Sequence, residues 1–333
     1  MTLGDTFKNA RALDRRTFLM GVTASTLLAS ASGSFAAMRK TVVSQNGLEG
    51  TFVRPDGTNP SPAVLIIAGS GPTDRDGNNP MGVRAASYRL LADALAAAGI
   101  GSLRYDKRGI AHSAARIQSE EHLRIGMFVD DAAMWATWLG RQEGIQSVIL
   151  VGHSEGALVA SLVAKKTPVA GVALLAAPGR KFGDIIRTQI ADMPMPGYAR
   201  AEANRIVSAL EAGSVVGSVH PGLYGMFRPS VQPFLISVLK VNPAVQIQNL
   251  SPSLPVLLVR GGRDLQINQE DFLALARARP DAEKLVLPTM NHALKDVGEG
   301  REANFRAYKD PRLPLAAGLA DGVAAFVSKH HVA

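Results

Sequence analysis

Cysteine is absent from this chain of 333 residues, and that absence excludes several kinds of chemistry at once. Without cysteine there is no disulfide bond, no thiolate metal site, no cysteine nucleophile and no lipid-modified cysteine anchor. Aromatic residues make up only 5% of the sequence, which is little for a protein that stacks on bases or grips sugars. The chemistry of the chain must therefore rest on other residue types.

Concentrated charge and familiar cofactor motifs are missing as well. Lys and Arg outnumber Asp and Glu by 36 to 28, but the excess is spread along the chain without a run of five like charges. This argues against a nucleic-acid-binding stripe. The seven histidines form no His-Glu-x-x-His motif, and no Gly-Lys-Ser/Thr sequence closes a phosphate loop. We therefore expect no metal ion, no cofactor and no nucleic-acid partner.

Residues 1–36 have the composition of an export signal. Arg15-Arg16-Thr17-Phe18-Leu19 is similar to a twin-arginine signal, and the stretch Met20–Ala37 after it is uncharged and rich in small residues. Its strongly apolar part is shorter than the ~20 residues that a membrane span needs. Ser34 and Ala36 are small residues at the two positions that a signal peptidase reads, which predicts cleavage after Ala36. The alternative is an amphipathic N-terminal helix with a chance arginine pair.

The export signal implies partners and a location for the chain. We expect recognition by the twin-arginine export machinery and by a signal peptidase, and a mature chain that is periplasmic or secreted. No stable membrane anchor is expected after cleavage. A passenger without cysteine suits this route, because no disulfide bond has to form after export.

After residue 40, short apolar runs alternate with helical patterns, and 47% of the chain is apolar, enough for a sizeable core. Several of the runs are almost continuous Val, Ile and Leu, as expected for strands covered on both faces. The alternation predicts an α/β fold with a doubly wound, mostly parallel sheet. The expected strands are 51–54, 63–68, 100–105, 147–151, 169–175, 256–260 and 284–287, and the expected helices are 84–98, 123–139, 157–164, 269–278 and 315–328.

The strand–helix rhythm stops between residues 180 and 251. This segment is rich in Gly, Pro and Met, is helical over 198–210, and contains no convincing buried strand. We interpret 180–251 as a cap inserted into the core, which then consists of residues 37–179 and 252–333.

The strongest motif lies where an expected strand meets an expected helix. The strand 147–151 continues into Gly152-His153-Ser154-Glu155-Gly156, and a helical pattern follows at once. A Gly-x-Ser-x-Gly sequence in this context forms a strained turn that exposes the serine hydroxyl, and its glycines allow close packing of strand and helix. The next backbone N–H, that of Glu155, helps to bind a developing oxyanion. Ser154 is therefore the candidate nucleophile.

A serine nucleophile needs a base, and the base needs an acid that orients it. Asp264 follows the expected strand 256–260, and His292 follows the next one, 284–287. The carboxyl ends of parallel strands meet at one edge of the sheet, which is where α/β proteins build their sites. Ser154, Asp264 and His292 also occur in the chain order that this kind of site requires.

These motifs together make the chain similar to the α/β-hydrolase superfamily over residues 40–330. Within it, the chain resembles bacterial esterases and serine-aminopeptidase-like hydrolases with a cap after the sixth strand. The resemblance rests on residues 152–156, 260–264 and 291–295, with further matches at 68–78 and 104–109. It implies Ser154 as the nucleophile, His292 as the base and Asp264 as the orienting acid. By position in the loop after the strand 63–68, it also implies the backbone N–H of Ser70 as the second oxyanion donor.

The expected reaction is hydrolysis of a small-molecule carboxylic ester or acyl substrate through an acyl-enzyme, with no cofactor, and the expected enzyme is a carboxylesterase. A thioesterase or an aminopeptidase or amidase uses the same groups, and a non-catalytic envelope binding protein is a further alternative. Met226 and Phe227 of the insertion are predicted to contact the substrate. The segment 74–78 begins like a calcium loop, but the later ligand positions do not fit, and we expect an ordinary loop. His153 is expected to support packing.

Overall fold

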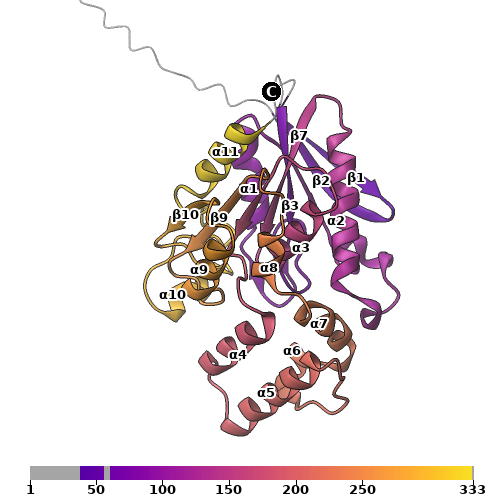
Figure 1. Cartoon of the computed structure of the whole chain (residues 1–333), viewed down its shortest axis with the longest axis vertical. Coiled ribbons are helices and arrows are strands. Elements are labelled where there is room, and N and C mark those ends of the chain that lie inside the picture. Colours follow the sequence, from indigo (N-terminus) through magenta and orange to yellow (C-terminus); the bar gives the residue numbers. More distant parts are fainter. Residues whose placement is uncertain (1–37, 56–60, 332–333) are drawn as a thin grey trace, which may run out of the picture. The chain divides into compact units, whose positions relative to one another are not determined.

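The computed structural model describes residues 38–55 and 61–331 (Figure 1). The predicted export signal, residues 1–36, lies outside the described residues. No helix within those two ranges is long and apolar enough to cross a membrane.

An eight-stranded sheet forms the centre of the core, with the strand order β1-β2-β6-β3-β7-β8-β9-β10. Strands β1 and β2 pair antiparallel, as do β2 and β6, and the neighbours from β6 to β10 pair in parallel. The strands are β1 Met38–Gln45, β2 Leu48–Pro55, β3 Ser61–Ile67, β6 Gly101–Tyr105, β7 Ile145–His153, β8 Gly171–Leu175, β9 Val256–Gly261 and β10 Glu283–Leu287. This is the mostly parallel sheet that the sequence predicts.

The central strands are apolar throughout because both faces of the sheet are covered. In β3, Leu65 and Ile67 join one core cluster, while Val64 and Ile66 join the cluster on the other face. Side chains alternate along a strand, so a strand between two helical layers needs apolar residues at every position. Burial of each such side chain contributes about 1.5–3 kcal/mol, which makes β3 and its neighbours the stable frame of the site.

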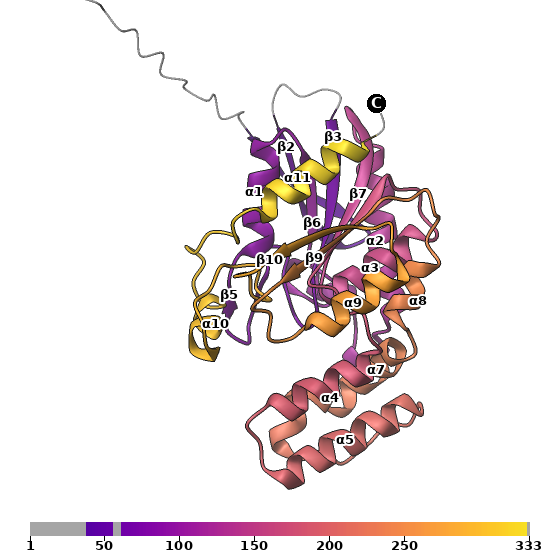
Figure 2. The same ribbon diagram turned by 60° about the vertical axis from the view of Figure 1, so that its left-hand side comes forward.

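Helices cover the two faces of the sheet. Helices α1 (Ser87–Ala97) and α11 (Leu319–His330) pack on one face, and α2 (Ile125–Gly140), α3 (Glu155–Ala164) and α9 (Gln269–Ala278) pack on the other. The view in Figure 2 shows α11 and α1 side by side in front of the strands. A two-stranded ribbon, β4 Asn78–Asn79 and β5 Val83–Arg84, precedes α1, and α10 (Arg301–Ala307) precedes α11.

All the strands and core helices expected from the sequence are present, with some shifted ends, but β1 and α10 were not predicted. Strand β1 is the edge of the sheet and mostly exposed, so its residues lack the apolar run that marks a buried strand. Helix α10 is only seven residues long, and just two of its residues are buried, so it has no clear apolar period.

Between β8 and β9, residues 182–248 form helices. They are α4 Phe182–Asp192, α5 Gly197–Glu211, α6 Tyr224–Phe227, α7 Gln232–Leu239 and α8 Pro243–Gln248, with short 3₁₀ turns before α6 and α7. Helices α4 to α7 lie together below the sheet in Figures 1 and 2. They share a small hydrophobic cluster of their own, which includes Ile206, Phe227 and Leu239. We call residues 180–251 the cap.

Helix α9 of the core holds both ends of the cap. Asp271 in its first turn is buried and accepts hydrogen bonds from the backbone N–H groups of Gly179 and Arg180, and it also pairs with the Arg180 guanidinium. At the other end of α9, Arg279 donates to the carbonyl groups of Leu250, Ser251, Pro252 and Leu254. Charge-assisted hydrogen bonds of this kind are short and strong, so one helix fixes where the cap leaves and re-enters the core.

Candidate active site

Ser154 lies in a strained turn between β7 and α3. Its φ of 54° and ψ of −122° are unusual for a residue with a side chain. The turn is possible because Gly152 and Gly156 have no Cβ atom: one added at Gly152 would lie 2.3 Å from the Gly156 oxygen, and one at Gly156 would lie 2.2 Å from the Ile67 oxygen. The strand, the helix and the neighbouring strand β3 therefore meet in the close packing that the motif predicts.

Asp264 and His292 come together at the carboxyl ends of β9 and β10. The two side chains are joined by a 2.8 Å hydrogen bond between Nδ1 of the imidazole and Oδ2 of the carboxylate. The other carboxylate oxygen of Asp264 accepts from the backbone N–H groups of Gln266 and Ile267 at 2.8 and 2.9 Å. The carboxyl group is thus held by three hydrogen bonds and is almost fully buried, in the position that the predicted orienting acid would need.

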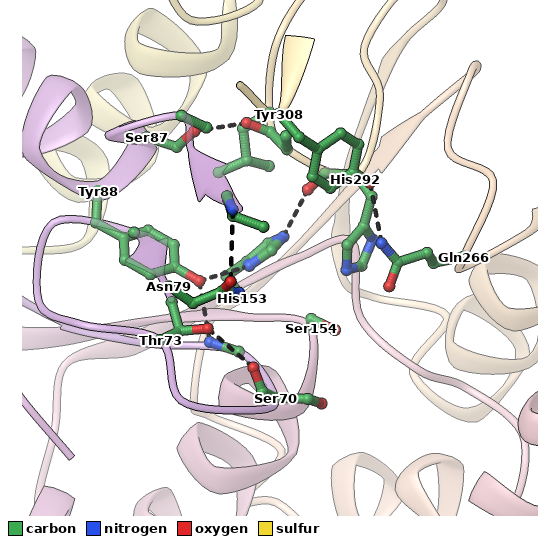
Figure 3. Close-up of a pocket in the computed structure, with 16 residues that line it drawn as sticks. Ser70, Thr73, Asn79, Ser87, Tyr88, His153, Ser154, Gln266, His292 and Tyr308 are labelled. Carbon is green, nitrogen blue, oxygen red and sulfur yellow. Dashed lines mark hydrogen bonds between the residues drawn. The ribbon is translucent and has the colours of Figure 1, made fainter. Parts of the chain in front are cut away.

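Ser154 and His292 line the same cavity, which has a volume of about 140 Å³ (Figure 3). No hydrogen bond joins the Ser154 hydroxyl to the His292 imidazole among the described residues. A contact of this kind often tightens only when substrate binds. Asp296, the nearest alternative acid in sequence, accepts instead from the Thr289 hydroxyl and the Ala317 N–H. We call this space cavity 1; its walls are Gly69, Ser70, Thr73, Gly77, Asn79, Val83, Ala85, Ser87, Tyr88, His153, Ser154, Gln266, His292, Ala293, Leu294 and Tyr308.

The backbone N–H groups of Ser70 and Glu155 are the predicted oxyanion donors. Glu155 is the first residue of α3, where N–H groups have no partner inside the helix. Within the described part of the chain, neither N–H has a hydrogen-bond partner. A Cβ atom added to Gly69 would lie 3.2 Å from the Cβ of Ser154, so the loop that carries Ser70 lies against the serine turn. Both N–H groups are therefore free beside Ser154.

The sequence 74–78, which begins like a calcium loop, is tied to the core by side chains. Buried Arg75 donates two side-chain hydrogen bonds to the Asp106 carboxylate and also pairs with Glu49. Its backbone N–H donates to Asp106 as well, at 2.8 Å. Glu49, Asp106 and His112 offer ligand atoms within 4.8 Å of one another, and the Arg75 guanidinium already forms ion pairs with both carboxylates. The contacts indicate a support for the Ser70 loop.

The chain is similar in sequence to known hydrolases. A family model described as serine aminopeptidase, S33, matches residues 81–206. Over 275 residues the chain is 27% identical to esterase EstD of Thermotoga maritima. The aligned residues make up 80% of this chain and 62% of the relative. The chain therefore spans less than two thirds of the length of that curated relative.

Solved structures show the same fold at lower sequence identity. The esterase domain of a Rhodothermus marinus protein is 18% identical with a TM-score of 0.52, covering 89% of this chain and 100% of that chain. The α/β hydrolase GrgF from Penicillium sp. sh18 is also 18% identical, with a TM-score of 0.57 and coverages of 89% and 99%. The chain has the α/β-hydrolase fold.

A buried chain of hydrogen bonds connects the parts of this α/β-hydrolase site. The N–H of Gly69 donates to the Tyr88 phenol oxygen at 2.9 Å, and Tyr88 contacts Nδ1 of His153 at 2.7 Å (Figure 3). Nε2 of His153 lies 2.9 Å from the backbone carbonyl oxygen of His292. The carbonyl can only accept, so His153 carries its proton on Nε2 and Tyr88 donates to Nδ1.

His153 stays neutral in this network. Burial lowers its pKa to about 3, with the nearby His292 imidazole as the next cause. Its ring therefore accepts at one nitrogen and donates at the other, which is the pattern that the two neighbours need. The interpretation of His153 as a supporting residue agrees with these contacts.

The sequence analysis missed Lys107, which lies beneath the Ser70 loop. Its side chain is buried, and its ammonium donates to the Gly69 carbonyl oxygen at 2.6 Å. Burial lowers the pKa of Lys107, and the nearby Glu155 acts in the opposite direction. Burial raises the pKa of Glu155, while Lys107 and the Ser70 hydroxyl oppose the rise. Only a three-dimensional arrangement brings these residues together, since they are far apart in sequence.

A second cavity, of about 130 Å³, lies between the cap and the core. The core contributes the loop at Gly71–Pro72, which follows Ser70, and the side chain of Glu155, which follows Ser154. Arg228 of the cap donates to the Glu120 carboxylate of the core, with one contact at 2.8 Å, and both residues line the space. We call it cavity 2; its other walls are Lys107, Arg108, Ile110, Leu123, Phe128, Val231 and Phe234.

The predicted substrate contacts Met226 and Phe227 line neither cavity. Phe227 is fully buried in the cap's own hydrophobic cluster, and Met226 packs against the same cluster. The periodicity of a short helix does not reveal which face meets the core, so the sequence could not separate these residues from their neighbours. The cap side chains that reach cavity 2 are Arg228, Val231 and Phe234.

Proposed function

We propose that the chain is a serine hydrolase that cleaves carboxylic esters. The observation that carries the proposal is that His292, which accepts support from Asp264 through a 2.8 Å hydrogen bond, lines the same cavity as Ser154. Similarity to proteins named as esterases supports the same activity. Apart from the substrate and water, the proposed reaction uses only side chains and N–H groups of the chain itself.

In the proposed mechanism, His292 removes the hydroxyl proton of Ser154 as the oxygen attacks the ester carbonyl carbon. Asp264 holds the Nδ1–H tautomer and stabilises the imidazolium that forms. The carbonyl oxygen becomes an oxyanion and accepts from the N–H groups of Ser70 and Glu155, each worth about 3–4 kcal/mol in the transition state. His292 then gives the proton to the leaving alkoxide, and water releases the acyl group by the reverse sequence.

The mechanism also assigns the two cavities. The leaving group must lie on the side of His292, because that imidazole protonates the departing oxygen. Cavity 1 contains His292 and its neighbours Ala293 and Leu294, so it accommodates the alcohol part. The acyl part then extends past the Ser70 loop toward cavity 2, where Phe128 and Phe234 provide apolar walls.

Amide hydrolysis is the second candidate, because the matching family model is named for a serine aminopeptidase. An aminopeptidase binds the charged amino group of its substrate, which favours an acidic side chain in the site. Cavity 1 has no Asp or Glu among the residues that line it. In cavity 2, Glu120 is paired with Arg228, and Glu155 faces Lys107. The charges of both cavities therefore favour a neutral ester.

Turnover of matched substrates tests this proposal. p-Nitrophenyl esters of graded acyl length, the corresponding thioesters and aminoacyl p-nitroanilides should give the highest kcat/KM for the esters. A fluorophosphonate probe should label Ser154 in the wild type and leave Ser154→Ala unlabelled, with the modified peptide identified by mass spectrometry. Labelling of a different serine, or ester turnover that survives in Ser154→Ala, would contradict the proposal. Anilide turnover above ester turnover would favour the peptidase.

The location of the protein is a separate part of the proposal. The arginine pair at 15–16 and the uncharged stretch after it support export to the periplasm or beyond. Envelope fractions should contain a chain that begins near Ala37 by N-terminal sequencing. Replacing both arginines with lysine should retain the full chain in the cytosol, whereas cytosolic wild-type protein that begins at Met1 would contradict export.

A further inference from the structure

The peptide unit between Gly69 and Ser70 is held on one side only. The Gly69 carbonyl oxygen accepts from the Lys107 ammonium at 2.6 Å, and the N–H of Gly69, on the preceding unit, donates to Tyr88 at 2.9 Å. The N–H of Ser70 belongs to the same planar unit as the Gly69 carbonyl, and it has no partner within the described part of the chain. The unit is therefore fixed through its oxygen and free at its nitrogen.

A trans peptide unit points its carbonyl oxygen and its N–H in opposite directions. The position of the Lys107 ammonium thus determines where the Ser70 N–H points. Without that ammonium, the carbonyl oxygen would lose its partner, and the unit could rotate at the flexible Gly69. A cation at the oxygen end also polarises the peptide, which strengthens the hydrogen bond that its N–H donates.

The surroundings of Lys107 keep a cation in a place where one is costly. Its side chain is only 4% exposed, and its Nζ lies 5.2 Å from the centre of the Phe128 ring. A buried ammonium is tolerated where it is hydrogen-bonded and faces an opposite charge. Here the hydrogen bond goes to Gly69, and Glu155, whose own N–H is the other free donor beside Ser154, lines the same cavity as Lys107.

We propose that Lys107 is a positioning residue of the oxyanion site: its ammonium holds the Gly69 carbonyl so that the Ser70 N–H is aimed at the oxyanion formed on Ser154. The inference rests on the proposed hydrolase function and extends it to a residue whose ammonium contacts the Gly69 carbonyl and not the reacting atoms. The oxyanion exists only after attack on the carbonyl, so Lys107 contributes to the transition state and little to substrate binding.

The test compares Lys107→Met with the surface variant Lys166→Met in the mature protein, residues 37–333. Lys166 makes an exposed ion pair with Asp130 and provides a matched loss of one lysine. With a neutral p-nitrophenyl ester, Lys107→Met should lower kcat about 10- to 100-fold and change KM less than about twofold, because loss of one oxyanion donor costs ~10²–10³. Lys166→Met should match the wild type in both constants.

A tetrahedral analogue separates positioning from general damage. The Ser154 oxygen adds to the carbonyl carbon of an alkyl trifluoromethyl ketone and forms an oxyanion. The matching methyl ketone binds without this addition and represents the bound substrate before attack. Lys107→Met should raise the inhibition constant of the trifluoromethyl ketone by the same factor by which kcat/KM falls. The inhibition constant of the methyl ketone should change by less than about twofold. Lys107→Arg, which keeps a cationic donor, should recover part of the loss.

Some outcomes would overturn the inference. Unchanged kcat in folded Lys107→Met would do so, and so would an increase in KM alone, which would make Lys107 a substrate-binding residue of cavity 2. An equal loss of affinity for both ketones would also overturn it, because it would indicate damage to the site as a whole. If Lys107→Met does not fold, Lys107→Gln takes its place, because the shorter amide cannot reach the Gly69 oxygen in the same way, and the same results are expected.

Failure of the inference is distinguishable from failure of the proposed function. If Ser154→Ala is inactive while Lys107→Met keeps a normal kcat, the serine hydrolase stands and only the role of Lys107 falls. If Ser154→Ala keeps full activity, the proposed function falls whatever Lys107→Met does.

Discussion

The two cavities beside Ser154 are built from different parts of the molecule. Cavity 1 has walls from the core alone, and a buried chain of hydrogen bonds from Gly69 through Tyr88 and His153 to His292 connects those walls. Cavity 2 is shared between the core and the cap, and a partly exposed ion pair, Glu120–Arg228, joins its two sides.

This difference separates what the reaction requires from what the substrate requires. Reacting groups must be held to within a fraction of an ångström, which buried and fully paired hydrogen bonds achieve. A wall that contacts only a substrate chain tolerates adjustment, and exposed ion pairs contribute little to rigidity. We therefore expect changes in cavity 1 to reduce turnover, and changes in the cap wall of cavity 2 to alter substrate preference.

The largest effect should follow from removing the reacting groups. Ser154→Ala and His292→Ala should each lower kcat by ~10³-fold or more, and the double variant should be little worse than either, because the residues act as one unit. Steady-state kinetics measure the effect, and circular dichroism with thermal melting serves as the control for folding. Additive losses would show that the two side chains act separately. That result would contradict the assignment of the reaction to cavity 1.

Asp264→Asn should come next, with a loss of ~10²- to 10⁴-fold in kcat, because an amide can hold the wrong imidazole tautomer. Asp296→Asn is the matched control, since the Asp296 carboxylate contacts Thr289 and Ala317 and not His292. That variant should keep kcat within a few-fold of the wild type. The reverse result in the same assay would mean that Asp296 is the orienting acid.

A smaller effect, on selectivity, should come from the cap wall. Phe234→Leu changes a side chain that lines cavity 2, and Phe227→Leu makes the same change in the cap's own cluster. Phe234→Leu should alter the ratio of kcat/KM between long and short acyl esters by about threefold to tenfold, as a few methylene contacts permit. Phe227→Leu should leave that ratio unchanged and lower the free energy of unfolding by ~1 kcal/mol.

If both variants keep the wild-type ratio of kcat/KM between long and short esters, the acyl chain does not bind in cavity 2. If only Phe227→Leu changes that ratio, Phe227 contacts the substrate, as the sequence predicted.

A further effect, on stability and not on turnover, concerns the buried His153 of the core. The pKa of His153 is about 3 in the folded state, well below its ordinary value of 6.5, so the unfolded chain binds an extra proton between those two pH values. The free energy of unfolding should therefore fall as pH drops from 6.5 toward 3, by up to about 1.4 kcal/mol per pH unit from this residue. Urea unfolding at several pH values measures the slope.

His153→Asn supplies the control, because its amide still offers a donor and an acceptor but does not titrate. Its slope in that pH range should be smaller than that of the wild type. An identical slope would mean that His153 is not held neutral by burial.

Part of the site followed from the sequence because local patterns carried it. Strands of almost continuous Val, Ile and Leu predicted a sheet covered on both faces, and the protein has that sheet. Gly152 and Gly156 marked the strained turn, since only residues without Cβ fit against neighbouring backbone there. The position of Asp264 and His292 after adjacent strands was sufficient to predict that they meet.

Other parts were out of reach because they depend on which faces of separate elements meet. Cap residues Met226 and Phe227 looked like pocket residues, but the packing of α6 turns Phe227 into the cap's own cluster. Lys107 stands in a sequence that gave no reason to connect it with Gly69 or Glu155. The role of Asp271 and Arg279 in holding the two ends of the cap also appears only when α9 lies between them.

The sequence by itself determined the order of strands and helices, the strained serine turn and the pairing of an aspartate with a histidine. Each of these depends on residue type within a short stretch or on the geometry that all parallel sheets share. Only the tertiary structure decided the division into two cavities, the hydrogen-bond chain through Tyr88 and His153, and the hold of Lys107 on Gly69. These contacts join segments tens of residues apart, and their distances arise only when the chain has packed.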